Sequence, residues 1–250
     1  MVILGIIPAR YASTRFPGKP LVNIGGKIMI QRVYEQACKA LEHVVVATDD
    51  ERIYNAVNNF GGRVVMTSDV HPSGTDRCAE AVINYETTYN QKVDIVINIQ
   101  GDEPFIAEQQ INLLANLFEN QNIELATLIK PITDEETLFN ANKPKVVIDA
   151  NGKALLFSRQ AIPYIRGSEP QDWINKYDFY QHIGMYGYRK ETLLKITKLS
   201  KSPLEIAESL EQLRWLENGY QIQTAITEDE GLSIDTPEDL EKINKLYKFC

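Results

Sequence analysis

Cysteine is scarce in this 250-residue chain, and the cysteines that occur form no recognisable pattern. Cys38, Cys78 and Cys250 are far apart, odd in number and never spaced as a C-x-x-C pair. A disulfide framework or a thiolate metal site needs paired or closely spaced cysteines. The sequence therefore argues against both, and it favours a reducing cytosol.

Long apolar runs are also missing. No stretch approaches the roughly 18 consecutive apolar residues that a membrane-spanning helix needs. The apolar opening, residues 2–7, is too short for the core of a signal peptide and has no basic leader. We therefore expect neither export nor membrane insertion, and we predict a cytoplasmic protein.

An excess of positive charge is the third feature that the chain lacks. It has 26 Lys and Arg against 34 Asp and Glu, a formal net charge of −8, which disfavours a general nucleic-acid or membrane-binding surface. With 44% hydrophobic and 24% charged residues, the chain has the composition of a soluble globular protein. Its length is enough for a sizeable core in one large or two modest domains.

What the chain does contain is an alternation of short apolar runs and amphipathic stretches. Strand patterns occur at residues 2–7, 44–47, 64–66 and 95–99, and helical patterns follow them near 28–41, 51–60, 75–89 and 108–119. This order predicts an α/β fold, a Rossmann-like and mostly parallel sheet with helices on both faces.

The alternation changes near residue 125. Short strand candidates at 125–129, 146–149 and 154–158 precede an aromatic stretch that contains proline and runs to residue 180. We interpret residues 125–182 as a smaller α+β subdomain within a single domain, 1–250. A strand at 183–188 then returns to the main sheet, followed by a helix near 203–217, a strand at 222–226 and a helix from 237.

A basic loop follows the first strand. Residues 6–19, IIPARYASTRFPGK, carry Arg10, Arg15 and Lys19 and no acidic residue, in a chain that is acidic as a whole. A loop at the carboxyl end of a parallel strand can bring cations and backbone N–H groups to a polyanion such as a triphosphate. A solvated surface loop is the alternative reading of the same residues.

Two carboxylates are candidates for a metal site. Asp102, in the stretch Gln-Gly-Asp-Glu-Pro, follows the strand at 95–99, and Mg²⁺ needs only one or two carboxylates besides substrate phosphates and waters. Asp235 precedes a Thr-Pro helix start, so capping alone could explain it. Because ligands bind at the carboxyl ends of strands in open α/β sheets, we expect both acids to share one crevice.

Further polar residues suit the other parts of a nucleotide and an acid sugar. Ser73 and Arg77 lie where a helix begins, a place that can hold an anion or the edge of a base. A polyhydroxylated acid sugar requires an arginine for its carboxylate and polar side chains for its hydroxyl groups. Arg159 could serve the carboxylate, and the hydroxyl groups could be bound by His182, Tyr186, Glu211 and Gln212. Each of these alone is more often structural.

Taken in order, these segments resemble one family from end to end. The chain is similar to 3-deoxy-manno-octulosonate (Kdo) cytidylyltransferases, the CMP-Kdo synthetases. The similarity is carried by residues 7–19, 46–49, 73–77, 98–104, 157–159, 182–189, 210–214 and 235–239. CMP-sialic acid synthetases share the opening loop and the 100–104 stretch more loosely. The chain departs from the family pattern at Phe16 and Ile28, where leucine and proline are usual, and at Lys143-Pro144.

The resemblance implies a role for each matching residue. Triphosphate contacts would come from Arg10, Ser13 and Lys19, and cytidine contacts from Ser73 and Arg77. Mg²⁺ would bind to Asp102 and Asp235. The sugar-acid pocket would be lined by Gln100, Arg159, His182, Tyr186, Glu211 and Gln212, with Arg159 as the partner of the carboxylate. Family members are homodimers, paired partly through the smaller subdomain.

The predicted reaction is transfer of CMP from CTP to Kdo with release of pyrophosphate, for lipopolysaccharide synthesis. Positioning and charge neutralisation by Arg10, Lys19, Asp102 and Asp235 would dominate, and no general base is assigned. Three alternatives stay open: a related acid sugar such as 8-amino-Kdo or sialic acid, a metal-dependent glycosyltransferase, and a catalytically silent nucleotide sensor. The glycosyltransferase would need an Asp-x-Asp pair, which Gln100-Gly101-Asp102 does not supply, and a silent sensor would have lost its metal acids.

Overall fold

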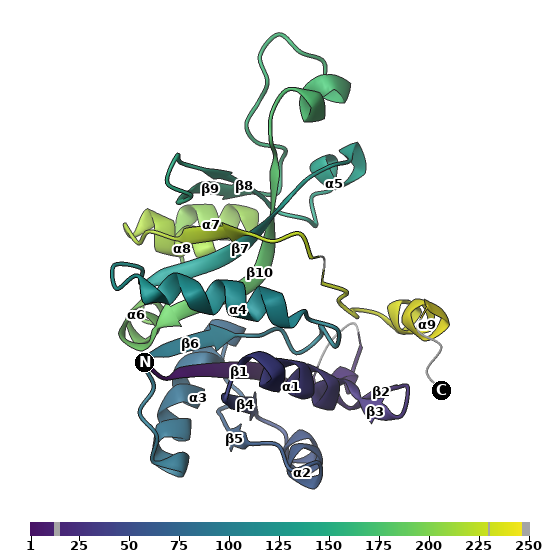
Figure 1. Cartoon of the computed structure of the whole chain (residues 1–250), viewed down its shortest axis with the longest axis vertical. Coiled ribbons are helices and arrows are strands. Elements are labelled where there is room, and N and C mark those ends of the chain that lie inside the picture. Colours follow the sequence, from purple (N-terminus) through teal and green to yellow (C-terminus); the bar gives the residue numbers. More distant parts are fainter. Residues whose placement is uncertain (13–15, 230, 247–250) are drawn as a thin grey trace.

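The computed structural model describes residues 1–12, 16–229 and 231–246 and is built around a nine-stranded sheet (Figure 1). The main strand order is β11-β7-β10-β6-β1-β4-β5, and the hairpin β8–β9 extends the sheet beside β10. The strands are β1 (Ile3–Ala9), β4 (His43–Thr48), β5 (Val64–Met66), β6 (Ile95–Asn98), β7 (Leu125–Pro131), β8 (Lys145–Ile148), β9 (Ala154–Ser158), β10 (Tyr180–Arg189) and β11 (Gln223–Ile226).

Most of the main strands run parallel, as the sequence predicts. β1 pairs in parallel with β4 and β6, β4 with β5, and β11 with β7, whereas β10 is antiparallel to both of its neighbours. The sheet places the carboxyl ends of β1, β4 and β6 at one edge. The loops that follow these strands carry the basic loop, Asp49 and Asp102.

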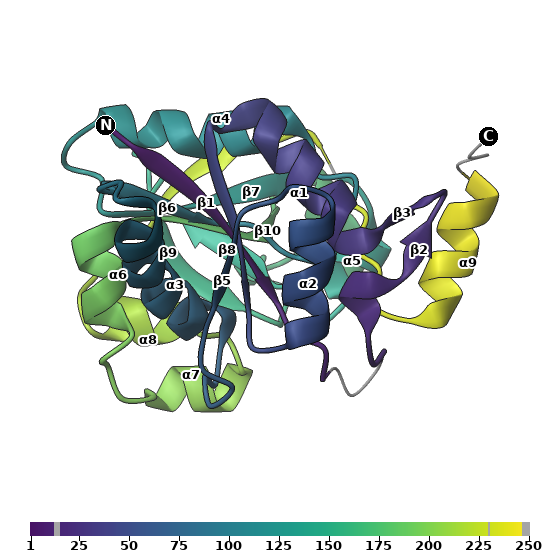
Figure 2. The same ribbon diagram turned by 90° about the horizontal axis from the view of Figure 1, so that it is seen from below.

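Helices cover both faces of the sheet (Figure 2), which explains why the strands are nearly continuous runs of aliphatic residues. One face packs against α1 (Met29–Ala40), α2 (Glu51–Asn59) and α4 (Glu108–Asn116). The other packs against α3 (Gly74–Tyr89), α6 (Lys190–Ile196) and α8 (Gln212–Glu217). Alternate residues of β1 serve the two cores: Leu4 and Ile6 face one, and Ile7 faces the other.

The predicted helix at 203–217 is wrong as a single element. It is two short helices, α7 (Pro203–Glu208) and α8, separated at Ser209, whose φ of 51° lies in the left-handed region. A left-handed residue ends a helix because it turns the chain away from the helical path. The break places Glu211 at the start of α8, close to the start of α3.

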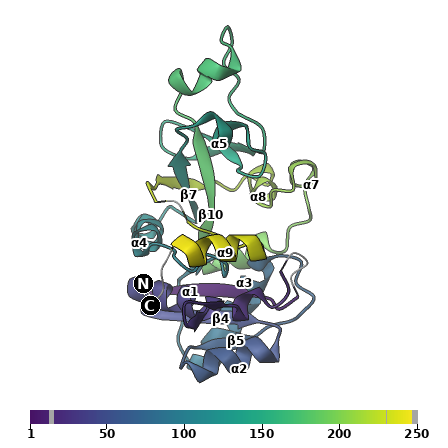
Figure 3. The same cartoon turned by 90° about the vertical axis from the view of Figure 1, so that its right-hand side faces the viewer.

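Residues between β7 and β10 form a separate small apolar cluster. Ile132, Leu138, Trp173 and Phe179 are buried together, with α5 (Glu135–Phe139) beside them. β7 pairs inside the main sheet, and Val146 and Phe157 of the β8–β9 hairpin belong to the main core, so the separate cluster is confined to residues 132–139 and 161–179. In the views of Figures 1 and 3 this segment extends from one end of the molecule.

The C-terminal segment crosses the molecule to reach α9 (Pro237–Leu246), as Figures 1 and 3 show. Ile234 and Ile243 pack there with Ile24 and Met29, next to the hairpin of β2 (Asn23–Ile24) and β3 (Lys27–Ile28). This docking brings the residues before α9 to the loops that follow β1 and β6. Within the described ranges, no helix is both long and apolar enough to cross a membrane.

Candidate active site

Two carboxylates from distant parts of the chain meet at one ammonium group. Lys19 Nζ lies 2.8 Å from Asp102 Oδ2 and 3.3 Å from Asp235 Oδ1. Because both oxygens contact the same nitrogen, they are no more than about 6 Å apart. The predicted proximity of Asp102 and Asp235 is therefore present in the structure.

Local structure fixes both acids. A Cβ on Gly101 would lie 2.7 Å from the carbonyl oxygen of Pro8, so only glycine allows the loop after β6 to approach the end of β1 this closely. The backbone N–H of Ile234 donates to the Asp102 carbonyl over 3.0 Å and ties the C-terminal segment to the same loop.

Capping does not explain Asp235. The Asp239 carboxylate accepts hydrogen bonds from the N–H groups of Asp235 and Thr236, and the Thr236 hydroxyl accepts from the N–H of Asp239. Thr236 and Asp239 thus cap the start of α9 reciprocally. The Asp235 carboxylate contacts Lys19 instead of serving as the cap.

The donor set fits a magnesium ion shared with a nucleotide. Among the described residues no cluster of three or more Asp, Glu, His or Cys could hold a metal alone. Two carboxylates that converge on one cationic group are nevertheless what Mg²⁺ uses when substrate phosphates and waters supply its other ligands. In this structure the ammonium of Lys19 is the cation that both carboxylates contact.

The neighbouring acid, Glu103, has a different environment. Burial, together with the charge of Asp102, raises its pKa to about 7. The Glu103 carboxyl packs against Gly231, where an added Cβ would lie 2.7 Å from Oε2. Desolvation disfavours the charged form of a carboxyl group, which is why the pKa of Glu103 is raised.

Arg10 lies beside the crevice at the end of β1. Its Nη2 donates to the Asp69 carbonyl over 3.2 Å, and its Nε lies 3.6 Å from Asp49 Oδ2. The side chain is 45% exposed, so donors remain accessible to a phosphate. Ser13 and Arg15, the other predicted residues of this loop, lie outside the described residues.

Arg77 lies in the interior and not on the crevice wall. Its side chain is 1% exposed and donates to Thr67 Oγ1 at 2.5 Å and to Asp49 Oδ2 at 2.7 Å. Direct contact between this guanidinium and a nucleotide would require the interior to open. The predicted cytidine contact of Arg77 thus stays a prediction, and its burial favours an indirect role.

The start of α3 and the start of α8 meet through hydroxyl groups. Ser73 Oγ lies 2.9 Å from Glu211 Oε1, and the Thr75 hydroxyl donates to Glu211 Oε2 over 2.6 Å. Burial raises the pKa of Glu211. Ser73, which is predicted to contact the nucleotide, is thus in contact with Glu211, which is predicted to contact the sugar.

A cavity of about 340 Å³ opens at this junction, lined by Ser73, Glu211, Ser209 and Arg214 among others. Arg159 reaches the same segment, where its guanidinium donates to the backbone carbonyls of Ala141, Glu208 and Ser209. These partners of the guanidinium are neutral carbonyl groups, and the predicted contact of Arg159 with a sugar carboxylate stays a prediction.

Two further predicted sugar residues carry buried polar atoms without a hydrogen-bond partner. They are the hydroxyl of Tyr186 and Nε2 of Gln212, as far as residues 1–12, 16–229 and 231–246 show. Buried polar groups are normally paired, so a ligand hydroxyl or a water is expected to complete them.

Gln100, in the loop after β6, and His182, in β10, lie next to an irregularity in β10. The pairing of β10 with β7 shifts register between Ile183 and Tyr186, and the carbonyl of the exposed Gly184 accepts a hydrogen bond from Gln100 Nε2 over 2.7 Å. His182 is buried, 3.1 Å from the Thr127 hydroxyl, and burial lowers its pKa to about 3. The imidazole is therefore neutral, and its predicted contact with a sugar remains a prediction.

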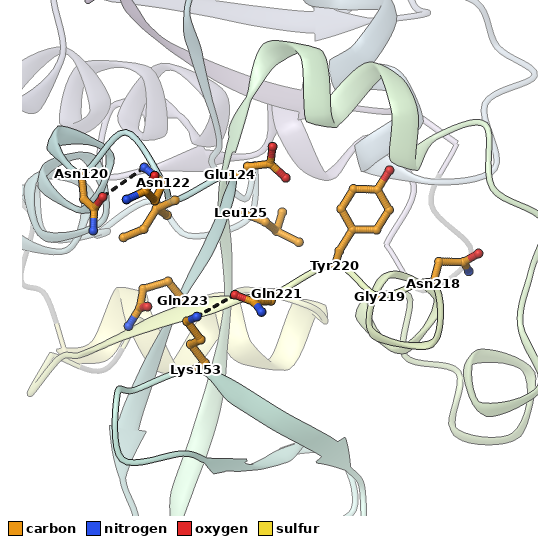
Figure 4. Close-up of a pocket in the computed structure, with 11 residues that line it drawn as sticks. Asn120, Asn122, Glu124, Leu125, Lys153, Asn218, Gly219, Tyr220, Gln221 and Gln223 are labelled. Carbon is orange, nitrogen blue, oxygen red and sulfur yellow. Dashed lines mark hydrogen bonds between the residues drawn. The ribbon is translucent and has the colours of Figure 1, made fainter.

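Sequence reasoning missed Asp49 and Thr75 as candidate site residues. The signal for Asp49 was its place at the carboxyl end of a parallel strand, where ligand-facing groups gather. A different cavity, of about 600 Å³, lies at the amino ends of β7 and β11 (Figure 4). None of the predicted site residues lines it, and five of its eleven lining residues carry amide side chains.

Comparison with known proteins gives consistent matches. A family model described as cytidylyltransferase matches residues 4–226. A 3-deoxy-manno-octulosonate cytidylyltransferase of Parabacteroides distasonis is 57% identical over 97% of this chain and 96% of its own length. One from Cytophaga hutchinsonii is 58% identical over 96% of each chain.

A solved structure agrees with these relatives. A CMP:2-keto-3-deoxy-manno-octonic acid synthetase complexed with CTP superposes with a TM-score of 0.88, at 40% identity, over 98% of each chain.

Proposed function

This chain belongs to the 3-deoxy-manno-octulosonate cytidylyltransferase family, and on that basis we propose that it transfers CMP from CTP to Kdo. The anomeric hydroxyl oxygen of Kdo bonds to the α-phosphorus of CTP. The bond from that phosphorus to the β-phosphate bridge breaks, and pyrophosphate leaves with its electron pair. The products are CMP-Kdo, pyrophosphate and the hydroxyl proton.

The observation that carries this proposal is the meeting of Asp102 and Asp235 at Lys19. Asp102 and Asp235 would hold Mg²⁺ together with the phosphates of CTP. A bound Mg²⁺ supplies charge neutralisation at the phosphates and lowers the pKa of a coordinated hydroxyl. When CTP binds, the Lys19 ammonium exchanges its carboxylate contacts for phosphate oxygens.

The remaining residues bind and orient the substrates. The Arg10 guanidinium offsets charge that develops on the leaving pyrophosphate. Arg159 attracts the Kdo carboxylate, and the unpaired groups of Tyr186 and Gln212 pair with its hydroxyls. Gln100 and Glu211 would contribute further polar contacts to the sugar. Holding both substrates in line supplies much of the rate enhancement.

A single assay tests the proposal. Purified protein is incubated with CTP and Mg²⁺, and pyrophosphate release is measured in parallel with Kdo, 8-amino-Kdo and sialic acid. We expect Kdo to give the highest kcat/KM, and we expect Asp102→Asn to lower it about a hundredfold or more. No turnover of any acid sugar, with CTP still bound, would support the silent sensor instead. Faster turnover of 8-amino-Kdo or sialic acid would replace Kdo as the substrate.

Assembly and cellular role follow as further proposals. We infer a homodimer, because apolar side chains are exposed on the β8–β9 hairpin and the extended segment: Leu155 is 60% exposed and Tyr164 is 73% exposed. Apolar side chains exposed on projecting elements are candidates for an interface with a second copy. CMP-Kdo made in the cytoplasm would serve as the sugar donor for lipopolysaccharide.

A further inference from the structure

Asp49 has no role in the function proposed above, but it lies beside Arg10 of the basic loop. It follows β4, and its Oδ2 lies 3.6 Å from Nε of Arg10. The Asp49 side chain is 13% exposed, far less than that of Arg10. The largely buried Asp49 carboxylate therefore contacts the exposed guanidinium of Arg10, which is predicted to bind the triphosphate.

Arg77 holds this carboxylate in place from the interior. Its Nη2 donates to the same oxygen, Asp49 Oδ2, over 2.7 Å, and its Nη1 donates to Thr67 Oγ1. A buried guanidinium requires acceptors, so Arg77 and Asp49 depend on each other. Arg77 lies in the first turns of α3, which packs against β1, β4 and β5. Asp49 is thus fixed by the core of the fold and needs no ordering when a ligand arrives.

The contact with Arg10 orients the guanidinium without using up its donors. At 3.6 Å the Nε to Oδ2 separation is an ion pair and too long for a hydrogen bond. One further nitrogen, Nη2, donates to the Asp69 carbonyl. Since a guanidinium has five N–H donors, several remain for phosphate oxygens.

Given the cytidylyltransferase function proposed above, we propose that Asp49 is a positioning residue that pre-orients Arg10 for the triphosphate of CTP. An unrestrained arginine loses much rotamer freedom when it binds a ligand, and a fixed partner removes part of that cost beforehand. Arg77 acts through Asp49 and does not touch the nucleotide. This places Arg77 in the nucleotide machinery although it is buried.

The test compares CTP affinity and steady-state kinetics in Asp49→Asn and wild type. By charge alone, loss of an anion beside a triphosphate would tighten CTP binding. Loss of positioning weakens it, so we expect the calorimetric Kd and the KM for CTP to rise about three- to tenfold, with a smaller change in kcat. Asp50→Asn is the matched control, because Asp50 pairs with Arg52 and caps α2, where asparagine is also a good cap.

A double-mutant cycle separates positioning from a purely structural effect. In an Arg10→Gln background, Asp49→Asn is expected to add no further loss of CTP affinity. If Asp49→Asn is too unstable to purify, it is combined with Arg77→Met, which removes the buried pair and leaves no unpaired buried cation. This double variant is then compared with and without Arg10→Gln. Wild-type CTP affinity in the single variant, or an undiminished loss in the Arg10→Gln background, would overturn the inference. Wild-type protein that binds CTP but releases no pyrophosphate would overturn the proposed function alone.

Discussion

At the scale of single residues, environment and not residue type assigns the roles of neighbouring acids. Asp102 and Glu103 are adjacent in the Gln-Gly-Asp-Glu-Pro stretch, and the sequence offers both as carboxylates. Asp102 contacts Lys19, whereas Glu103 is enclosed and has its pKa raised to about 7. The sequence could nominate the pair, but the enclosure of Glu103 by Gly231 depends on a segment more than a hundred residues away.

Glu103 should make stability depend on pH near neutrality. Its pKa in the folded protein, about 7, lies above the ordinary 4.5, so the folded state retains a proton that the unfolded state loses. The stabilisation is complete below about pH 4.5 and is lost as the pH rises to about 7. We expect Glu103→Gln to retain stability over this range, with a difference from wild type on the order of 3 kcal/mol at pH 8 relative to pH 4.5.

Urea denaturation of both proteins between pH 4.5 and 8 measures this difference. Glu119→Gln, at an exposed position, is the control and should follow wild type. Parallel curves for Glu103→Gln and wild type would contradict the assignment.

At the scale of elements, periodicity predicted most helices and strands of the α/β core correctly. Apolar runs such as 44–47 and 64–66 became β4 and β5, because parallel strands buried on both faces leave a strong sequence signal. The break at Ser209 left no such signal, since neither glycine nor proline marks it. The burial of Arg77 was also hidden, because the carboxylate that makes it tolerable comes from another element.

β10 contains a glycine that sets how closely α4 and its following turn approach the sheet. A Cβ on Gly187 would lie 2.4 Å from Cε2 of Phe118, which is 1% exposed. We expect Gly187→Ala to lower the free energy of unfolding by about 1–3 kcal/mol through overpacking. Gly184→Ala in the same strand meets nothing within 4 Å and should change it by less than about 0.5 kcal/mol. Chemical denaturation measures both, and equal effects would contradict this reading of the packing.

At the scale of the whole molecule, the strand order builds the site. Because β1 is paired with both β4 and β6, the loops that carry Arg10, Asp49 and Asp102 lie next to one another. The C-terminal segment, which leads into α9 (Figure 3), then delivers Asp235 from the far end of the chain to Lys19. Sequence patterns could suggest this convergence only through the general rule for parallel sheets.

The proposed homodimer is also a property of the whole molecule. If the exposed apolar residues of the β8–β9 hairpin and the extended segment form an interface, light scattering should give twice the chain mass of 28.4 kDa. Leu155→Glu, on an exposed position of β9, should shift the mass toward the monomer. A wild-type monomer at micromolar concentration would contradict the proposed homodimer.

The central claim is that Asp102 and Asp235 hold one Mg²⁺ together with CTP. Isothermal titration calorimetry of CTP, with and without Mg²⁺, tests it most directly in wild type, Asp102→Asn, Asp235→Asn and the double variant. We predict that each single variant loses about tenfold or more of the Mg²⁺-dependent gain in affinity, and that the double variant loses little more than either one. Without Mg²⁺, the variants should bind CTP as tightly as wild type or tighter, because a negative charge has been removed beside the triphosphate. Undiminished Mg²⁺ dependence in either single variant, or losses that add independently in the double variant, would contradict a shared ion.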